Sequence, residues 1–212
     1  MDSGFAGESA LEISEGLAET GVELIQYRDK AATPRRLFET CSALASRLRG
    51  RARFIVNDRA DIAELCDAGG VHVGQEDLSA ADARAMCGGA RWVGVSTHNL
   101  EQFRAALETS ADYIAVGPVF ATTTKKNPDP VVGLEFVARA RAMTRTPIVA
   151  IGGITAENAE SVYRAGADSV AVIRDLIAHG KPAERAAEYL RIAAKVRGES
   201  GLARNSGSGI DG

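Results

Sequence analysis

The stretch Asp112-Tyr113-Ile114-Ala115-Val116-Gly117-Pro118-Val119-Phe120 lies near the middle of the chain and is mostly apolar. Its length and its β-branched and aromatic residues predict a buried strand of a parallel sheet. The segment that follows, Thr122-Thr123-Thr124-Lys125-Lys126-Asn127, carries three hydroxyl groups and two ammonium groups. Such groups at the C-terminal end of a strand can bind phosphate oxygens, and they are equally compatible with a polar surface loop.

Six further apolar runs alternate with amphipathic segments along the chain. The runs cover 23–28, 53–58, 70–74, 91–97, 147–153 and 169–173, and the amphipathic segments include 34–49, 100–109, 133–143, 156–165 and 188–196. Strands that alternate with helices predict βαβ units and a parallel sheet. Because no Gly-x-Gly-x-x-Gly turn follows the first strand, seven such units favour an α/β fold of the (β/α) barrel type over a doubly wound sheet.

Length and charge predict one domain with a small ligand. The chain has 212 residues and a formal net charge of -3, without a dense run of Lys or Arg. This length can bury one substantial core, and the charge argues against nucleic acid or a membrane as a partner. We expect a single domain over residues 1–197 and a disordered tail over 198–212, which is rich in Gly, Ser and Asn.

The N-terminal segment and the cysteines predict a cytoplasmic protein. Residues 1–10 have neither the pattern of a signal peptide nor that of a transmembrane span. The wide spacing of Cys41, Cys66 and Cys87 favours reduced thiols over disulfides or a metal cluster.

Charged residues at the end of the first run predict a site for a pyrophosphate. Gln26, Arg28 and Lys30 are spaced by two residues, so an extended backbone points all three side chains the same way. A guanidinium and an ammonium group suit a pyrophosphate, although Lys30 would also fit an exposed charged edge. In a barrel, these residues lie at the C-terminal ends of the strands, where active sites are found.

Carboxylates follow the next two runs. Asp58 comes directly after the second, and Asp77 lies in the loop Gly74-Gln75-Glu76-Asp77 after the third. Two carboxylates from neighbouring loops, completed by water and phosphate, are a usual way to hold Mg²⁺. Each of the two could instead cap a helix, but the basic residues nearby favour the metal site.

The later runs predict a second, monophosphate-type site. Ser96 ends one run, and Gly152 and Gly153 end another just before a helix, where backbone N–H groups can approach an anion. Ile173 and Arg174 follow the last run in the same way. The alternatives of a core residue and a pocket residue stay open for His72.

Together these segments resemble the thiamine-phosphate synthase family over residues 12–177. The motifs that carry the resemblance are Gln26-x-Arg28-x-Lys30, Asn57-Asp58-Arg59, Gly70-Val71-His72-Val73-Gly74-Gln75-Glu76-Asp77, Gly94-Val95-Ser96-Thr97-His98, Gly117-Pro118-Val119-Phe120-Ala121-Thr122-Thr123-Thr124-Lys125 and Ile151-Gly152-Gly153-Ile154-Thr155. The resemblance implies a TIM (β/α)8 barrel. It also implies a transferase that joins a pyrimidine diphosphate to a thiazole phosphate with Mg²⁺ as cofactor and releases pyrophosphate.

The resemblance further implies a role for each motif. Pyrophosphate would be held by Arg28, Lys30, Asn57, Ser96 and Lys125, Mg²⁺ by Asp58 and Asp77, and the thiazole phosphate by Thr122, Thr124, Gly153, Ile173 and Arg174. Lys125, Ser96 and Arg28 are the predicted catalytic residues, and Gln26, His72 and Gly152 complete the predicted substrate-binding set.

Two departures from the family pattern stand out. The barrel of the family opens with a strand, but residues 1–7 are too short and too rich in Gly for one, so we expect seven strands with an open edge. An open edge favours self-association, and a homo-oligomer is compatible with it. Second, Arg174 stands where a small residue is common.

Two other functions compete with the transferase. One is a thiazole tautomerase-like isomerase with the same barrel, against which Asp77 and Lys125 argue. The other is a non-catalytic module that binds thiamine precursors, which the absent strand motivates.

Overall fold

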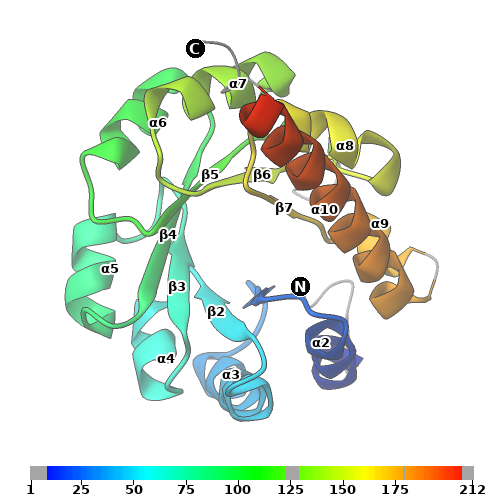
Figure 1. The fold of residues 1–212 in the computed structure, drawn as a ribbon. Coiled ribbons are helices and arrows are strands. Elements are labelled where there is room, and N and C mark those ends of the chain that lie inside the picture. The colour runs from blue at the N-terminus through cyan, green and yellow to red at the C-terminus, as the bar shows by residue number, and fades with distance from the viewer. Residues whose placement is uncertain (1–8, 123–128, 179, 207–212) are drawn as a thin grey trace.

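The computed structural model describes residues 9–122, 129–178 and 180–206, with side chains up to Glu199. The described strands form one parallel sheet in chain order, β1 to β7. They are β1 (Leu24–Tyr27), β2 (Arg53–Asn57), β3 (Gly70–Val73), β4 (Trp92–Thr97), β5 (Tyr113–Val116), β6 (Ile148–Ile151) and β7 (Ser169–Ala171). Figure 1 shows the sheet curled at the centre with the helices around it. The expected barrel-type α/β fold with seven strands is confirmed.

Helices follow the strands and cover the outside of the sheet (Figure 1). They are α2 (Ala10–Glu19), α3 (Pro34–Leu48), α4 (Ala60–Leu65), α5 (Ala80–Cys87), α6 (Leu100–Leu107), α7 (Gly133–Met143), α8 (Ala156–Arg164), α9 (Arg174–Ile177) and α10 (Pro182–Ser206). Local sequence sets several of their starts. Thr33, Ser79 and Asn99 each accept a hydrogen bond from a backbone N–H in the first turn, which satisfies a donor that the helix cannot pair.

The middle strands are buried on both faces. Every residue of β3 and of β5 is buried, as expected for strands that pack against helices outside and against other strands inside. Gly94 on β4 allows this packing, because a Cβ atom there would overlap the ring of Tyr113. The interior between β3 and β5 is therefore filled by an aromatic side chain.

The two end strands leave the barrel open. Within the described residues, β1 pairs with β2 and β7 pairs with β6, and no pairing joins β1 to β7. Ser169 and Ala171 of β7 are exposed, unlike every residue of β3 and β5. Residues 1–8, where the missing strand would be sought, lie outside the described part of the chain.

Helix α10 continues past the point at which the sequence predicts disorder. It reaches Ser206, whereas composition places the start of the tail at residue 198. Two contacts tie this end of the helix to the domain: Arg197 donates to the carbonyl of Asp168, and Glu199 pairs with Arg164. Composition carries no information on such contacts. Residues 207–212 lie outside the described part of the chain. A domain boundary at residue 197 stays a prediction.

Two further findings concern the described residues as a whole. Cys41, Cys66 and Cys87 are all free and buried, in agreement with the prediction of reduced thiols. Over the described ranges, the structure contains no helix with the length and apolar character needed to cross a membrane.

Candidate active site

A cavity of about 1550 Å³ runs through the open barrel and reaches the C-terminal ends of its strands. The sequence-predicted residues that line it are Gln26, Arg28, Asn57, His72, Ser96, Thr122, Gly152, Gly153, Ile173 and Arg174. The cavity also extends along the open side of the barrel to Tyr189 on α10. Lys30, Asp58 and Asp77 are not among its lining residues, although Asp58 directly follows Asn57, which is one. Thr124 and Lys125 fall outside the described part of the chain. The fold thus brings together ten of the predicted substrate-binding residues around one cavity.

Gln26 and Asn57 join the ends of β1 and β2. The amide of Gln26 donates to Oδ1 of Asn57 at 2.6 Å, and both side chains are partly buried. The parallel register places Gln26 opposite Ile55, so Asn57 lies further along β2 and its side chain reaches back to β1. This bond fixes two polar groups at the edge of the cavity, next to Arg28.

Asp58 and Asp77 form a carboxylate pair at the ends of β2 and β3. Burial raises the pKa of Asp58, and the neighbouring carboxyl of Asp77 raises it further, while Lys30 opposes the shift. The ammonium of Lys30 lies 3.1 Å from Oδ2 of Asp58. Asp77 accepts a hydrogen bond from the backbone N–H of Gly74 at 2.8 Å, which orients its carboxylate. Two carboxylates that repel one another in a partly buried place fit a divalent cation.

The backbone at Asp58 is unusual. Asp58 has φ 65°, in the left-handed region that residues other than Gly seldom adopt, and its N–H donates to the carbonyl of His72 on β3. Such conformations are concentrated at functional sites, where the surrounding structure maintains them. The turn places the Asp58 carboxylate beside the end of β3, which leads to Asp77.

His72 lies between two hydroxyl groups inside the barrel. Its Nδ1 is 3.0 Å from the hydroxyl of Tyr113, and its Nε2 is 2.8 Å from Oγ of Ser96. The His72 side chain is therefore both a buried residue, with 6% exposure, and a lining residue of the cavity. The position of His72 is compatible with both alternatives, and its role in substrate binding stays a prediction.

Sequence reasoning missed two residues of this group. Tyr113 was assigned only to a buried strand, yet its hydroxyl contacts His72, and burial raises its pKa. Gln75 donates from its amide to the carbonyl of Ser96 at 2.7 Å. Gln75 could have been found from the sequence, because it lies in the same motif as Asp77. Tyr113 could not, because a tyrosine in a buried strand does not by itself indicate a site.

The glycines after β6 lie against the loop that follows β5. Gly152 and Gly153 have φ 89° and 65°, and the N–H of Phe120 donates to the carbonyl of Gly152 at 3.1 Å. A Cβ atom on Gly153 would lie 2.5 Å from the carbonyl oxygen of Ala121, and one on Gly152 would overlap Pro118. Only Gly satisfies both the positive φ and the close approach of these two backbones.

His98 is another residue that sequence reasoning assigned no role. Its Nδ1 is 2.5 Å from the carbonyl of Gly117, and its Nε2 is 3.5 Å from Oδ2 of Asp129. His98 and Asp129 both line the cavity. His98 thus contacts Gly117, which precedes Thr122 in the chain, and Asp129, which follows it.

Comparison with known proteins agrees with the geometry. The profile of the thiamine monophosphate synthase family matches residues 1–176. A thiamine-phosphate synthase from Koribacter versatilis is 49% identical over 176 residues, which cover 83% of this chain and 82% of the relative. One from Chloroflexus aurantiacus is 41% identical over 203 residues, with coverages of 95% and 93%. The structure of a thiamine phosphate pyrophosphorylase from Pyrococcus furiosus matches with a TM-score of 0.81 and 32% identity, over 89% of this chain and 91% of that one.

Proposed function

The chain belongs to the thiamine monophosphate synthase family, and from that premise we propose how its residues carry the reaction. It is a transferase that joins hydroxymethylpyrimidine diphosphate to the phosphate ester of hydroxyethylthiazole, giving thiamine phosphate and pyrophosphate. The observation that carries the residue roles is the Asp58–Asp77 pair with Lys30. Asp58 directly follows Asn57, which lines the cavity together with Arg28 and Ser96.

The leaving pyrophosphate would lie at the ends of β1 to β4. Arg28 and Asn57 line the cavity there, and Ser96 lines it from β4 with its hydroxyl held by His72. Lys125 would add a further positive charge from the loop after β5. Donors and cations that are already in place stabilise the negative charge that grows on the leaving group, without any cost of reorganisation.

Asp58 and Asp77 would hold Mg²⁺, and the residues present fit this ion. Their oxygens are hard ligands, and burial together with the neighbouring Asp77 raises the pKa of Asp58, a cost of ionisation that a bound cation would offset. Over the described residues, no group of three or more His, Cys, Asp or Glu side chains is placed to bind a metal, so the other ligands would come from water and the diphosphate. The chemistry that bound Mg²⁺ supplies here is the neutralisation of charge on the pyrophosphate oxygens.

The bond changes require no nucleophile from the protein. The C–O bond between the pyrimidine methylene and the pyrophosphate breaks, and the electron-rich aminopyrimidine stabilises the resulting cation. The thiazole nitrogen then forms the new C–N bond to that carbon. The protein contributes alignment of the two substrates and stabilisation of charge, each of which can lower such a barrier by several kcal/mol.

The thiazole phosphate would lie at the other end of the cavity, at the ends of β5, β6 and β7. Gly152 and Gly153 let their backbone approach the loop after β5, and Thr122, Ile173 and Arg174 line the same cavity. Thr124 would join them from the loop outside the described residues. A cytoplasmic location and a homo-oligomeric state are part of this proposal as well.

A turnover assay tests the proposal against the two other functions. Purified protein is incubated with both substrates and with Mg²⁺ or EDTA, and thiamine phosphate and pyrophosphate are measured. We expect equal amounts of both products with Mg²⁺ and a large loss with EDTA. Isomerisation of a thiazole compound without a pyrimidine substrate would instead support the isomerase, and binding of both substrates without product would support the binding module.

A further inference from the structure

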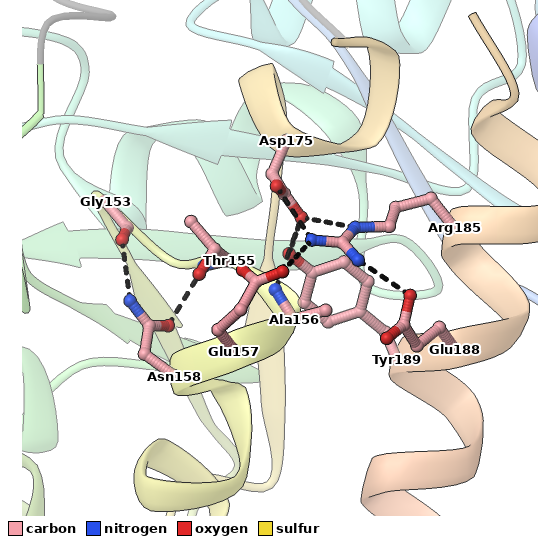
Figure 2. Close-up of polar contacts among 9 residues, drawn as sticks. All are labelled: Gly153, Thr155, Ala156, Glu157, Asn158, Asp175, Arg185, Glu188 and Tyr189. Atoms are coloured by element: carbon pink, nitrogen blue, oxygen red, sulfur yellow. Dashed lines mark hydrogen bonds and ion pairs between the residues drawn. The ribbon is translucent and has the colours of Figure 1, made fainter. Parts of the chain in front are cut away.

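A partly buried carboxylate joins three helices next to the predicted thiazole phosphate site (Figure 2). Asp175 of α9 accepts hydrogen bonds from Arg185 of α10, with 2.8 Å from Nε to Oδ2 and 3.0 Å from the terminal nitrogen to Oδ1. The hydroxyl of Tyr189 donates to the same carboxylate at 2.5 Å, and the backbone N–H of Ala156 at the start of α8 donates at 3.3 Å. We call Asp175, Arg185 and Tyr189 the α9 clamp.

The clamp is a strong contact by its geometry and its burial. The Asp175 side chain is 12% exposed and that of Arg185 is 15% exposed. Burial raises the pKa of Asp175, but the hydrogen bonds from Arg185 and Tyr189 outweigh it and leave the pKa below its ordinary value. A two-pronged guanidinium–carboxylate pair of this kind fixes orientation as well as distance.

Helix α9 packs only shallowly against the core. None of its four residues is fully buried, and only Leu176 packs as a partly buried residue against the core. The helix follows β7, which is the end strand of the open sheet and pairs with β6 over three residues. A loop after a strand with one neighbour lacks the support that a closed barrel provides.

The clamp connects the two segments that are predicted to line the thiazole phosphate. Helix α8 begins immediately after Gly152-Gly153-Ile154-Thr155, and α9 begins immediately after Ile173. Through the N–H of Ala156, Asp175 sets the distance between these two starts. The side chain of Asn158 on α8 accepts a hydrogen bond from the backbone N–H of Thr155 and donates one to the carbonyl of Gly153 (Figure 2). These two bonds fix the glycine turn to α8 as well.

We propose that Asp175 is a positioning residue for the phosphate of the thiazole substrate, acting with Arg185 and Tyr189. Because β7 pairs only with β6 within the described residues, the clamp supports Ile173 and Arg174 on the other side and fixes their position relative to the start of α8. The inference rests on the proposed function, because it assumes that these residues face the thiazole phosphate.

The test compares Asp175→Asn with the wild type in steady-state assays with both substrates. We expect the KM for the thiazole phosphate to rise about tenfold, the effect of losing a hydrogen bond to a charged group. The KM for the pyrimidine diphosphate and the kcat should change less than about threefold. The preference for the thiazole phosphate over the unphosphorylated thiazole alcohol, as a ratio of kcat/KM values, should fall by a similar factor of about ten.

Three further variants make the test specific. Tyr189→Phe removes one hydrogen bond, is expected to fold even if Asp175→Asn does not, and should raise the same KM by about threefold. Asp175→Glu keeps a carboxylate and should recover part of the loss. Glu188→Gln is the matched control, because Glu188 contacts Arg185 within α10 at 2.7 Å and does not reach α9. Its kinetics should equal those of the wild type.

The possible outcomes separate the inference from the proposed function. A wild type that turns over both substrates, with variants whose KM values and phosphate preference are unchanged, would overturn the inference and leave the function standing. Equal rises in both KM values, with lower melting temperatures, would also overturn it, since they indicate a general structural role. A wild type that neither binds nor converts the thiazole phosphate would remove both.

Discussion

The two ends of the cavity are built from different parts of the chain. At the ends of β1 to β4, the predicted pyrophosphate half consists of side chains such as Arg28, Asn57 and Ser96. At the ends of β6 and β7, the predicted thiazole phosphate half consists mainly of backbone, with Gly152 and Gly153 at positive φ. The function of the pyrophosphate half depends on the charges of its side chains. The function of the thiazole phosphate half depends on the relative position of the loops after β6 and β7. Substitutions should therefore affect chemistry in the first half and substrate affinity in the second.

The largest effect is expected at the carboxylate pair. Asp77→Ala should lower turnover by on the order of 10²-fold or more, because the charge on the leaving group would lose its stabilisation. Steady-state rates over a range of Mg²⁺ concentrations measure this effect. Glu76→Gln is the matched control in the same loop, and it should leave the rate and the Mg²⁺ dependence near those of the wild type. An Asp77→Ala rate and Mg²⁺ dependence equal to those of the wild type would contradict the metal site.

A substitution of Lys125, which falls outside the described residues, tests the same predicted pyrophosphate half of the site. Lys125→Ala should lower kcat by on the order of 10²-fold, since the ammonium would act on charge that develops in the transition state. Its neighbour Lys126 provides the control, and Lys126→Ala should change kcat less than about threefold. If Lys125→Ala changed only the KM for the thiazole phosphate, the residue would belong to the other half of the site.

The backbone half should respond through affinity. Gly153→Ala places a methyl group 2.5 Å from the carbonyl oxygen of Ala121, at φ 65°. The loops must separate, and the KM for the thiazole phosphate should rise by about tenfold or more, with a smaller change in kcat. Gly50→Ala is the control for the backbone strain alone, because Gly50 has φ 74° and no neighbour within 4 Å of the added atom. Equal kinetic effects of the two substitutions would show that the contact between the loops does not matter.

The smallest effect is on stability and depends on pH. Burial raises the pKa of Asp175, but hydrogen bonds from Arg185 and Tyr189 lower it to below its ordinary value of 3.8. The ionised carboxylate therefore stabilises the fold at pH values above 3.8, and this contribution is lost as the pH falls through the lower folded-state pKa.

Denaturant unfolding of the wild type and of Asp175→Asn, at a series of pH values, measures this contribution. The difference in unfolding free energy should be about 1–3 kcal/mol at neutral pH and should decrease below pH 4. A difference that stays constant across this range would mean that the charge of Asp175 does not contribute to stability.

Most of the pyrophosphate half could be predicted from the sequence. Gln26, Arg28 and Asn57 follow apolar runs directly, and the ends of parallel strands lie at one edge of a sheet, so their proximity follows from local pattern. The partnership of His72 with Tyr113 could not be predicted, because these residues are 41 apart in sequence and both read as strand residues. Their contact depends on the register of the sheet, which pairs both residues with Gly94 of β4, a residue without a side chain that would separate them.

The sequence by itself determined the alternation of strands and helices, the charges at the strand ends and the family. These features are local, since apolar runs, spacing and motif residues are read within a few positions. The tertiary structure alone decided how the open side of the barrel is supported. Asp175, Arg185 and Tyr189 resemble any surface residues in the sequence, and they meet only because α10 packs across the ends of α8 and α9. A clamp of this kind depends on the relative placement of three helices, which no local pattern contains.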